Sequence, residues 1–172
     1  IKRNIGYMSQ KFSLYNNLTV WENIRLFAGI YGLSKQETKQ RAENIFKQLD
    51  FEKERNTLVA SLPLGWKQKL SFSIATIHKP EIVFLDEPTG GVDPITRRQF
   101  WEMIYKAADK GTTIFVTTHY MDEAEYCSRV SIMVDGVIKA LDTPMCLKQQ
   151  FGVQTIDEVF RILARDAKRG GQ

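Results

Sequence analysis

Apolar residues follow two different spacings along the chain, one typical of strands and one typical of helices. Short runs rich in apolar residues, bounded by Gly, Pro and Asp, favour buried strands. They occupy residues 4–9, 82–86, 113–118, 130–134 and 137–141. The last two runs flank Asp135-Gly136, a dipeptide that favours a two-residue β-hairpin. The pattern therefore predicts three core strands far apart in the sequence and one local hairpin.

Between these strands, apolar residues spaced three and four apart predict amphipathic helices. Three helix starts carry a capping box, in which Ser or Thr is followed three residues later by Glu. The boxes are Thr19-x-x-Glu22, Ser34-x-x-Glu37 and Thr155-x-x-Glu158. Three more helices are expected: Trp66–His78, 94–109 behind the capping pair Asp93-Pro94, and Met121–Cys127. Residues 15–78 thus form an all-helical block, and His78 is expected to cap a helix C-terminus, favourably when charged.

Two adjacent carboxylates, Asp86 and Glu87, follow the apolar run Ile82–Leu85 directly. If this strand belongs to a parallel sheet, both side chains emerge at its carboxyl edge, where open α/β sheets bind ligands. Nucleotide hydrolases use such a pair to hold Mg²⁺ and orient a water molecule. A plain strand end with solvated acids is the alternative, but the exit Pro-Thr-Gly-Gly-Val-Asp-Pro makes the stretch far more specific.

The stretch LDEPTGGVDP resembles the Walker B motif and D-loop of ATP-binding-cassette (ABC) ATPases, and three further segments agree with that family in order and spacing. Ile5–Gln10 is similar to the Q-loop strand. Leu62–Leu70 (LPLGWKQKL) lies where the LSGGQ signature belongs. Thr117-Thr118-His119 is similar to the switch-histidine loop, 32 residues after Glu87. Four motifs in register over residues 5–119 make coincidence implausible.

The resemblance implies a role for each polar residue in these motifs. Asp86 would hold Mg²⁺ through water, and Glu87 would orient or deprotonate the attacking water. Gln10 would reach Mg²⁺ or water, and His119 would contact the γ-phosphate. Asp93 would meet the opposite subunit, although it is equally a helix cap. A surface-turn role for Gln10 and a structural role for His119 are the alternatives.

The signature departs from the family pattern. Pro63 takes the serine position and Leu64 the first glycine position, so the chain loses a hydroxyl and an N–H and gains bulk. The amides of Leu64, Gly65 and Trp66 remain, as does the helix dipole, so they are the expected phosphate donors. We expect a weakened contact to ATP on the other cassette. Variants of this type resemble drug exporters related to daunorubicin-resistance transporters.

The fold implied is α/β, with a P-loop NTPase (ABC ATPase) core of mostly parallel sheet and an all-helical subdomain. No glycine begins a G-x-x-x-x-G-K-[ST] run, so we expect the amino-terminal part of the cassette to be missing and this segment alone to be inactive. The strands and helix that normally cover the sheet would then be lacking too. The expected parts are the Q-loop strand (1–14), the helical subdomain with the signature (15–78), the Walker B, D-loop and H-loop part of the core (79–141), and a helical extension (142–172).

Composition narrows the possible partners. The net charge is +4, and Arg161, Arg165, Lys168 and Arg169 concentrate part of it at the tail, which is either solvated or in contact with anionic lipid. The sequence contains no basic patch interleaved with aromatic residues, the pattern that would indicate nucleic-acid binding. Cys127 and Cys146 lack metal-ligand spacing and suit a reducing compartment, and no apolar stretch approaches 18 residues.

The leading interpretation is the ATP-hydrolysing subunit or domain of an ABC exporter, peripheral on the cytoplasmic side of the cell membrane. It would use ATP and Mg²⁺ and pair with a second cassette and with a transmembrane permease, on which the helical block would dock. The alternatives are a non-transport ABC ATPase associated with DNA or ribosomes, and a degenerate regulatory cassette. Asp86, Glu87 and His119 argue against the last.

Overall fold

The computed structural model describes residues 4–10 and 14–169, except the side chains of residues 166–169. The side chains of Lys168 and Arg169, which are part of the expected basic tail, lie outside the described residues, as do residues 170–172. The chain forms two compact units, Ile1–Thr117 and Thr118–Gln172. This boundary falls inside the segment 79–141 expected for the ATPase core, and the four-part division stays a prediction.

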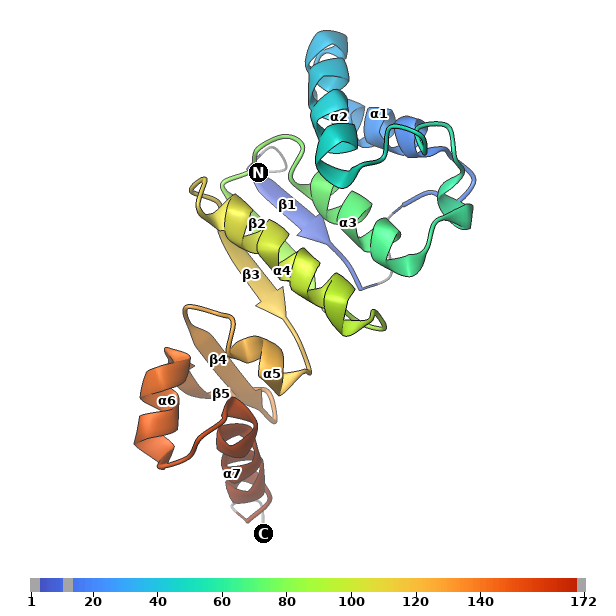
Figure 1. Cartoon of the computed structure of the whole chain (residues 1–172). Coiled ribbons are helices and arrows are strands. Elements are labelled where there is room, and N and C mark those ends of the chain that lie inside the picture. The colour runs from blue at the N-terminus through green and yellow to red at the C-terminus, as the bar shows by residue number, and fades with distance from the viewer. Residues whose placement is uncertain (1–3, 11–13, 170–172) are drawn as a thin grey trace. The chain divides into compact units, whose positions relative to one another are not determined.

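The first unit is built on a parallel sheet in the order β1-β2-β3 (Figure 1). Its strands are β1 (Ile5–Met8), β2 (Ile82–Asp86) and β3 (Thr113–Thr117). The three strands predicted from the sequence are therefore confirmed, and they pair although about 70 residues separate the first two. All three end at one edge of the sheet, because parallel strands share their direction.

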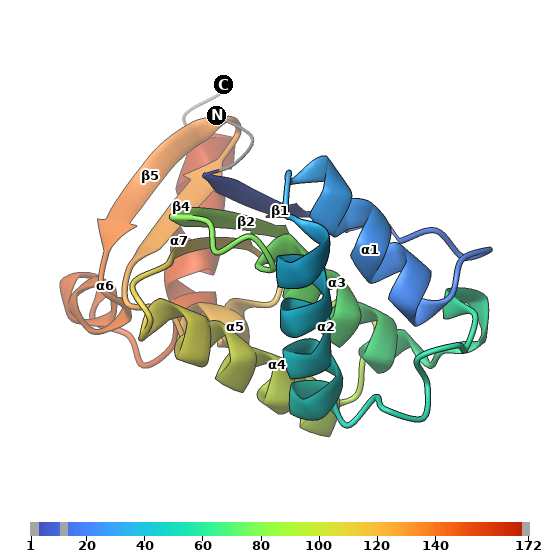
Figure 2. The ribbon, with the colours of Figure 1, turned by 90° about the horizontal axis from the view of Figure 1, so that it is seen from above.

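Four helices complete the first unit. They are α1 (Val20–Ile30), α2 (Lys35–Leu49), α3 (Leu64–Ala75) and α4 (Pro94–Ala108), with a short 3₁₀ turn at Val59–Ser61. The first three form the predicted helical block, packed around Ile24, Phe46 and Leu70, which are fully buried. Figures 1 and 2 both show α4 lying along one side of the sheet. The capping boxes of α1 and α2 are confirmed, with both reciprocal hydrogen bonds present in each.

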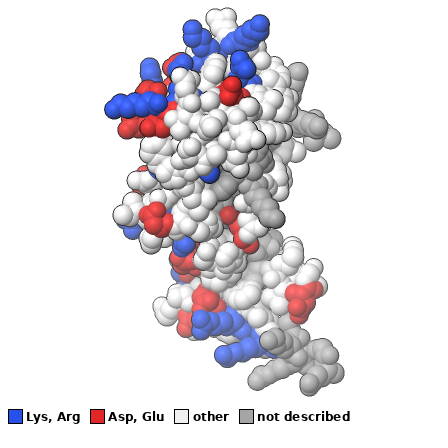
Figure 3. All heavy atoms as spheres, turned by 90° about the vertical axis from the view of Figure 1, so that its right-hand side faces the viewer, with Lys and Arg blue, Asp and Glu red and all other residues white. Residues whose placement is uncertain are grey.

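The surface of α2 carries charges of both signs. Figure 3 shows Lys and Arg side chains interspersed with Asp and Glu at the end of the first unit that carries this helix. Arg41 pairs with Glu37 at 3.5 Å, and Arg55, from the following loop, pairs with Glu43. The guanidinium of Arg55 also lies 4.6 Å from the centre of the Phe46 ring. These contacts hold the loop 50–61 against α2.

Within the described residues of the first unit, helices cover one face of the sheet. Val83 and Leu85 are buried beneath the helices, whereas Phe84 between them is 40% exposed. Phe84 is the register partner of both Tyr7 and Phe115, which are 55% and 54% exposed. The Phe84 and Phe115 rings stack with their centroids 5.3 Å apart. Within the first unit, the Phe84 side of β2 is therefore the exposed side.

The sequence suggested that His78 caps the C-terminus of α3, but the structure shows a different role for this residue. Its Nε2 is hydrogen-bonded to the carbonyl oxygen of Ile5 at 3.0 Å, and its ring stacks on Tyr31 with centroids 3.8 Å apart. Its Nδ1 is buried without a hydrogen-bond partner among the described residues. Burial lowers the pKa of His78, and the neighbouring charge of Arg41 lowers it further against the effect of the Ile5 carbonyl. The imidazole therefore belongs to a contact between α3 and β1 that favours its neutral form.

The lowered pKa of His78 makes the stability of the first unit pH-dependent. Because folding disfavours the imidazolium, the stabilising contribution is complete above the unfolded pKa near 6.5 and falls as the pH drops below it. We expect the urea midpoint of the parent to fall between pH 7.5 and 5.5. His78→Phe, which keeps the stacking on Tyr31, should lose less over the same interval. Equal losses in the two proteins would show that His78 does not carry this effect.

The second unit contains the predicted hairpin and three helices. Its elements are α5 (Met121–Ala124), β4 (Val130–Val134), β5 (Val137–Asp142), α6 (Pro144–Phe151) and α7 (Ile156–Arg169). The antiparallel hairpin β4-β5 and the Thr155-x-x-Glu158 cap of α7 are confirmed. Helix α6 lies in the expected helical extension but was not predicted as a separate element, although Thr143-Pro144 starts it as Asp93-Pro94 starts α4.

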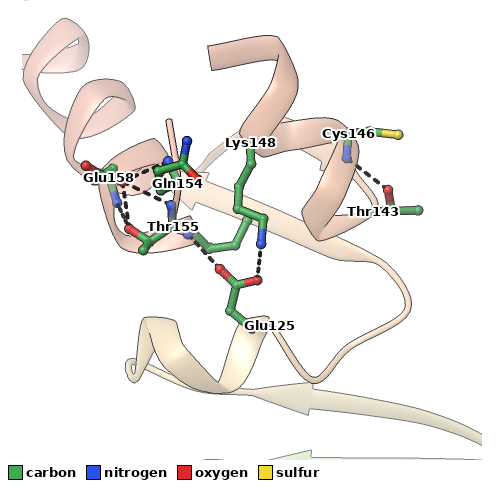
Figure 4. Close-up of polar contacts among 8 residues, drawn as sticks. Glu125, Thr143, Cys146, Lys148, Gln154, Thr155 and Glu158 are labelled. Atoms are coloured by element: carbon green, nitrogen blue, oxygen red, sulfur yellow. Dashed lines mark hydrogen bonds and ion pairs between the residues drawn. The ribbon is translucent and has the colours of Figure 1, made fainter. Parts of the chain in front are cut away.

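Glu125 joins the helices of the second unit. Figure 4 shows its carboxylate between α6 and the start of α7. It accepts hydrogen bonds from Lys148 Nζ at 2.6 Å and from the Ile156 amide at 3.0 Å. A hydrophobic core of Val130, Ile132, Leu147 and Val159 lies beneath this link.

Neither cysteine is in a disulfide, and burial raises the pKa of the Cys127 thiol, so this group is a poor nucleophile.

Candidate functional site

Asp86 and Glu87 emerge together where β2 ends, and Thr117 on β3 fixes both. Thr117 pairs with Asp86 in the strand register, and its hydroxyl donates to Asp86 Oδ1 at 2.7 Å. The same hydroxyl accepts the Glu87 amide at 3.1 Å. Asp86 therefore keeps its second oxygen for a ligand, and its orientation is set by the neighbouring strand. Thr117 was not among the predicted site residues, although its place at the end of β3 was the available signal.

Gln10 reaches the same sheet edge from β1. Met8 at the end of β1 is the register partner of Leu85, which precedes Asp86 directly. Two residues further along, Gln10 Nε2 donates to Glu87 Oε2 at 2.6 Å. The structure thus brings together Gln10, Asp86 and Glu87, which lie on two separate sequence motifs. This arrangement is the one that the strand order β1-β2-β3 requires.

The backbone turns sharply at Glu87. Glu87 has a φ of 45°, in the left-handed region that residues other than glycine rarely adopt. The Gly90 amide closes the turn by donating to the Glu87 carbonyl at 3.3 Å, and Gly91 follows with a φ of 76°. Non-glycine residues in such conformations persist only when their surroundings hold them, and they cluster at functional sites.

Asp93 caps α4, as predicted. Its Oδ1 accepts the amides of Ile95 and Thr96 at 3.0 Å each, and the Thr96 hydroxyl donates to its Oδ2 at 2.6 Å. These hydrogen bonds, that of the Thr96 hydroxyl first, lower the pKa of Asp93. The carboxylate is therefore ionised and committed to the helix start. Its contact with an opposite subunit stays a prediction.

The signature segment begins α3 with Pro63 at the N-cap, which has no side-chain cap hydrogen bond. The amides of Leu64 and Gly65 are the first two of the helix and have no acceptor within it. The Trp66 amide, by contrast, donates to the Pro63 carbonyl at 3.0 Å. The Trp66 ring stacks on Phe51 in the helical block, with centroids 4.6 Å apart. We therefore restrict the proposed phosphate donors to Leu64 and Gly65, since Trp66 is already engaged.

Gly65 lies against the start of α4. A Cβ at this position would come within 2.5 Å of Thr96 Cγ2, closer than real Cβ contacts occur. The Thr96 hydroxyl donates to Asp93, so the methyl group cannot rotate away without loss of that hydrogen bond. Only glycine therefore allows the start of α3 to approach the start of α4 this closely.

His119 lies at the start of the second unit, just before α5. Its ring packs against that of Tyr120, with centroids 4.1 Å apart. The preceding Thr118 accepts the Tyr120 amide at 3.0 Å and donates to the buried carboxylate of Glu123 at 2.7 Å. The loop that carries His119 is therefore held by its own unit. Its contact with a γ-phosphate stays a prediction.

The acidic pair suits Mg²⁺ better than a metal held by protein ligands alone. No group of three His, Cys, Asp or Glu that could hold a metal occurs in the described part of the chain. Mg²⁺ keeps several waters and is commonly bound by one or two carboxylates together with substrate phosphates. The free oxygen of Asp86 and the amide oxygen of Gln10 fit that requirement.

The parallel sheet and the helical block agree with the resemblance of the four motifs to ABC ATPases. Comparison with known families shows to which family the chain belongs. The family model described as ABC transporter matches residues 1–90. The chain belongs to the ABC transporter family. The predicted family and the α/β fold class are thereby confirmed, and ATP-binding domains of this family are generally ATPases that bind ATP, usually with Mg²⁺.

Similar proteins include bacterial transporter components with drug-related names. The chain is 46% identical over 149 residues to the "Probable multidrug ABC transporter ATP-binding protein YbhF" of Escherichia coli, covering 87% of this chain and 26% of that protein. It is 33% identical over 156 residues to the "Linearmycin resistance ATP-binding protein LnrL" of Bacillus subtilis, covering 90% and 50%. The chain thus spans about a quarter of the length of YbhF and half of the length of LnrL.

A solved structure, "Structure of ATP binding subunit of ABC transporter", superposes on this chain with a TM-score of 0.81. The sequence identity is 31%, and the match covers 94% of this chain and 68% of the other. No helix in the described residues is both long and apolar enough to cross a membrane.

Proposed function

We propose that this chain is part of the ATP-hydrolysing component of an ABC exporter of drug-like molecules. The observation that carries the proposal is the cluster of Gln10, Asp86 and Glu87 at the carboxyl edge of a parallel sheet, in a member of the ABC transporter family. The drug-exporter assignment is supported by the names of YbhF and LnrL, which describe multidrug transport and linearmycin resistance.

Each polar group has a distinct task in this proposal. Mg²⁺, when bound with ATP, would neutralise phosphate charge, and Asp86 and Gln10 would hold it. Glu87 orients the attacking water and accepts its proton. His119 contacts the γ-phosphate. The amides of Leu64 and Gly65 at the start of α3 face the γ-phosphate of ATP held by a second cassette, where helix N-termini favour anions.

The partners proposed are a second ATPase cassette and a transmembrane permease, with the chain peripheral on the cytoplasmic side of the membrane. The helical block, residues 15–78, is proposed to contact the permease. Because the 172 residues contain no G-x-x-x-x-G-K-[ST] run, we propose that they hydrolyse ATP only together with a segment that supplies this phosphate cradle.

The proposal is tested by measuring ATP hydrolysis in inverted membrane vesicles that contain the complete protein. Vesicles with the parent should hydrolyse ATP in a Mg²⁺-dependent manner and take up daunorubicin, whose fluorescence reports transport. Vesicles with Glu87→Gln should do neither. Mg²⁺-dependent hydrolysis without any drug uptake would leave the ATPase but contradict the drug-exporter assignment. Hydrolysis that does not exceed that of vesicles lacking the protein would contradict the proposal itself.

The variant signature provides a second test. The double substitution Pro63→Ser and Leu64→Gly should raise ATP hydrolysis by about tenfold, the equivalent of one hydrogen bond to a charged group. The added hydroxyl and the open backbone would strengthen the contact between cassettes. Pro63→Ala is the matched control, since it removes the proline without adding a donor. A lower rate in the double variant would instead show that Pro63 and Leu64 are adapted to this protein.

A further inference from the structure

The turn that carries Glu87 is held from one side by the signature helix. Gln68, in the second turn of α3, is only 1% exposed. Its Nε2 donates to the Gly90 carbonyl at 3.1 Å, and the Gly90 amide in turn donates to the Glu87 carbonyl at 3.3 Å. Two hydrogen bonds therefore connect α3 to the backbone of Glu87.

Burial of a glutamine side chain at position 68 is unfavourable for the free energy of folding. Its Oε1 is buried and has no hydrogen-bond partner among the described residues, and an unpaired buried polar atom is unfavourable. A methionine of similar length and volume would fill the same space without that cost. An apolar side chain would therefore pack about as well as this amide. What the amide adds is the hydrogen bond to Gly90.

Two close contacts add to this connection. The methyl group Cδ2 of Leu64 lies 3.4 Å from where a Cβ of Gly91 would be, and Gly65 lies against Thr96. The start of α3 thus touches the turn at Gly91 and the start of α4 at Thr96. A shift of α3 would therefore change its contacts with the segment between Glu87 and α4.

We propose that Gln68 is a positioning residue, which fixes the orientation of the Glu87 carboxylate by linking the signature helix to the turn at Gly90. The inference rests on the proposed ATPase function. It gives the signature helix two tasks: its first amides face the γ-phosphate of ATP on a second cassette, and Gln68 transmits the position of the helix to the water-activating carboxylate of its own chain. Formation of the contact between cassettes and orientation of Glu87 are then coupled.

The decisive substitution is Gln68→Met in the complete protein, assayed for ATP hydrolysis. We expect kcat to fall roughly ten- to a hundredfold, because a misplacement of about 1 Å can have an effect of this size. The KM for ATP and the urea midpoint should match those of the parent, since no ATP-binding group changes and the unpaired Oε1 is removed. Hydrogen exchange of the peptide that spans residues 87–93 should be faster than in the parent, with or without ATP.

The matched control is Gln99→Met. Gln99 on α4 accepts a hydrogen bond from Lys69 on α3 at 2.6 Å, so this variant removes a polar contact of the residue next to Gln68, made to α4 and not to the turn. Its kcat and its exchange at residues 87–93 should equal those of the parent. A parental kcat in Gln68→Met would overturn the proposal. So would a loss of kcat matched by a lower urea midpoint, which would indicate a structural role alone.

A second variant, Gln68→Glu, keeps the shape of the side chain and donates to Gly90 only when protonated. Burial raises the pKa of such a carboxyl group, so lowering the pH restores the donor. The ratio of its kcat to that of the parent, both measured at the same pH, should rise as the pH falls. A ratio that does not change with pH would overturn the proposal even if Gln68→Met failed to fold. Absence of ATP hydrolysis in the parent would instead contradict the proposed function.

Discussion

Glu87→Gln should reduce ATP hydrolysis by the complete protein by roughly 10²–10⁴-fold, the usual contribution of a positioned general base. The amide has the shape of the carboxylate and can still accept the hydrogen bond from Gln10 Nε2. It cannot take a proton from water at neutral pH. ATP binding and ATP-driven association of cassettes should therefore be retained. Phosphate release measures the first effect, and light scattering with ATP measures the second.

The matched control is Glu81→Gln, the same change at the opposite end of β2. Glu81 is exposed, and its backbone forms hydrogen bonds with Asn4 and Thr113. Its rate of hydrolysis should equal that of the parent. Turnover at the parental rate in Glu87→Gln would show that another group activates the water, whereas loss of ATP-driven association would show that Glu87 binds rather than catalyses.

Gly6→Ala should destabilise the first unit by about 1–3 kcal/mol, the usual effect of an added methyl group in a closely packed site. A Cβ on Gly6 would lie 2.4 Å from the Ala75 carbonyl oxygen and 3.1 Å from Val83 Cγ2. The nearest atom is backbone at the end of α3, so relief requires β1 and α3 to separate. Urea unfolding followed by tryptophan fluorescence measures the loss. Since β1 leads to Gln10, the rate of ATP hydrolysis should fall as well.

Gly29→Ala provides the comparison for the same chemical change. Gly29 is in α1, and no atom lies within 4 Å of its missing Cβ. Alanine should stabilise the helix there by about 0.5–1 kcal/mol, because glycine loses more backbone freedom on folding. The two substitutions are therefore expected to shift the urea midpoint in opposite directions. Unchanged stability in Gly6→Ala would be evidence against the close approach of β1 and α3.

Local sequence signals predicted the elements that position the site. The run before Asp86, the cap at Asp93 and the capping boxes at Thr19 and Ser34 each depend on a few neighbouring residues, and all are present in the structure. The meeting of Gln10 with Glu87 followed from the resemblance to a family. Spacing alone does not give it, because 77 residues separate the two.

Features that depend on tertiary packing were not predicted from the sequence. The contact of His78 with Ile5 joins segments 73 residues apart, so a local helix-end pattern suggested a cap instead. The apolar pattern of a strand does not show which of its two sides is covered, so it did not single out the exposed Phe84. Likewise, Gln68 is one of several polar residues in the signature, and only its hydrogen bond to Gly90 distinguishes it.

For the variant signature, the sequence and the structure give complementary information. The sequence shows which groups Pro63 and Leu64 remove, and the structure shows which remain. Trp66 is turned into the helical block against Phe51, so the start of α3 is anchored by a ring where the family pattern has a glutamine.

The most direct test of the account is the structure of the complete Glu87→Gln protein with ATP and Mn²⁺, in which the manganese is located by its anomalous scattering. We expect the metal beside Asp86 and Gln10 at the end of β2, with the γ-phosphate next to residue 87. A nucleotide and metal bound elsewhere, with Asp86 and Gln10 facing only solvent, would contradict the assignment of this sheet edge as the site of ATP hydrolysis.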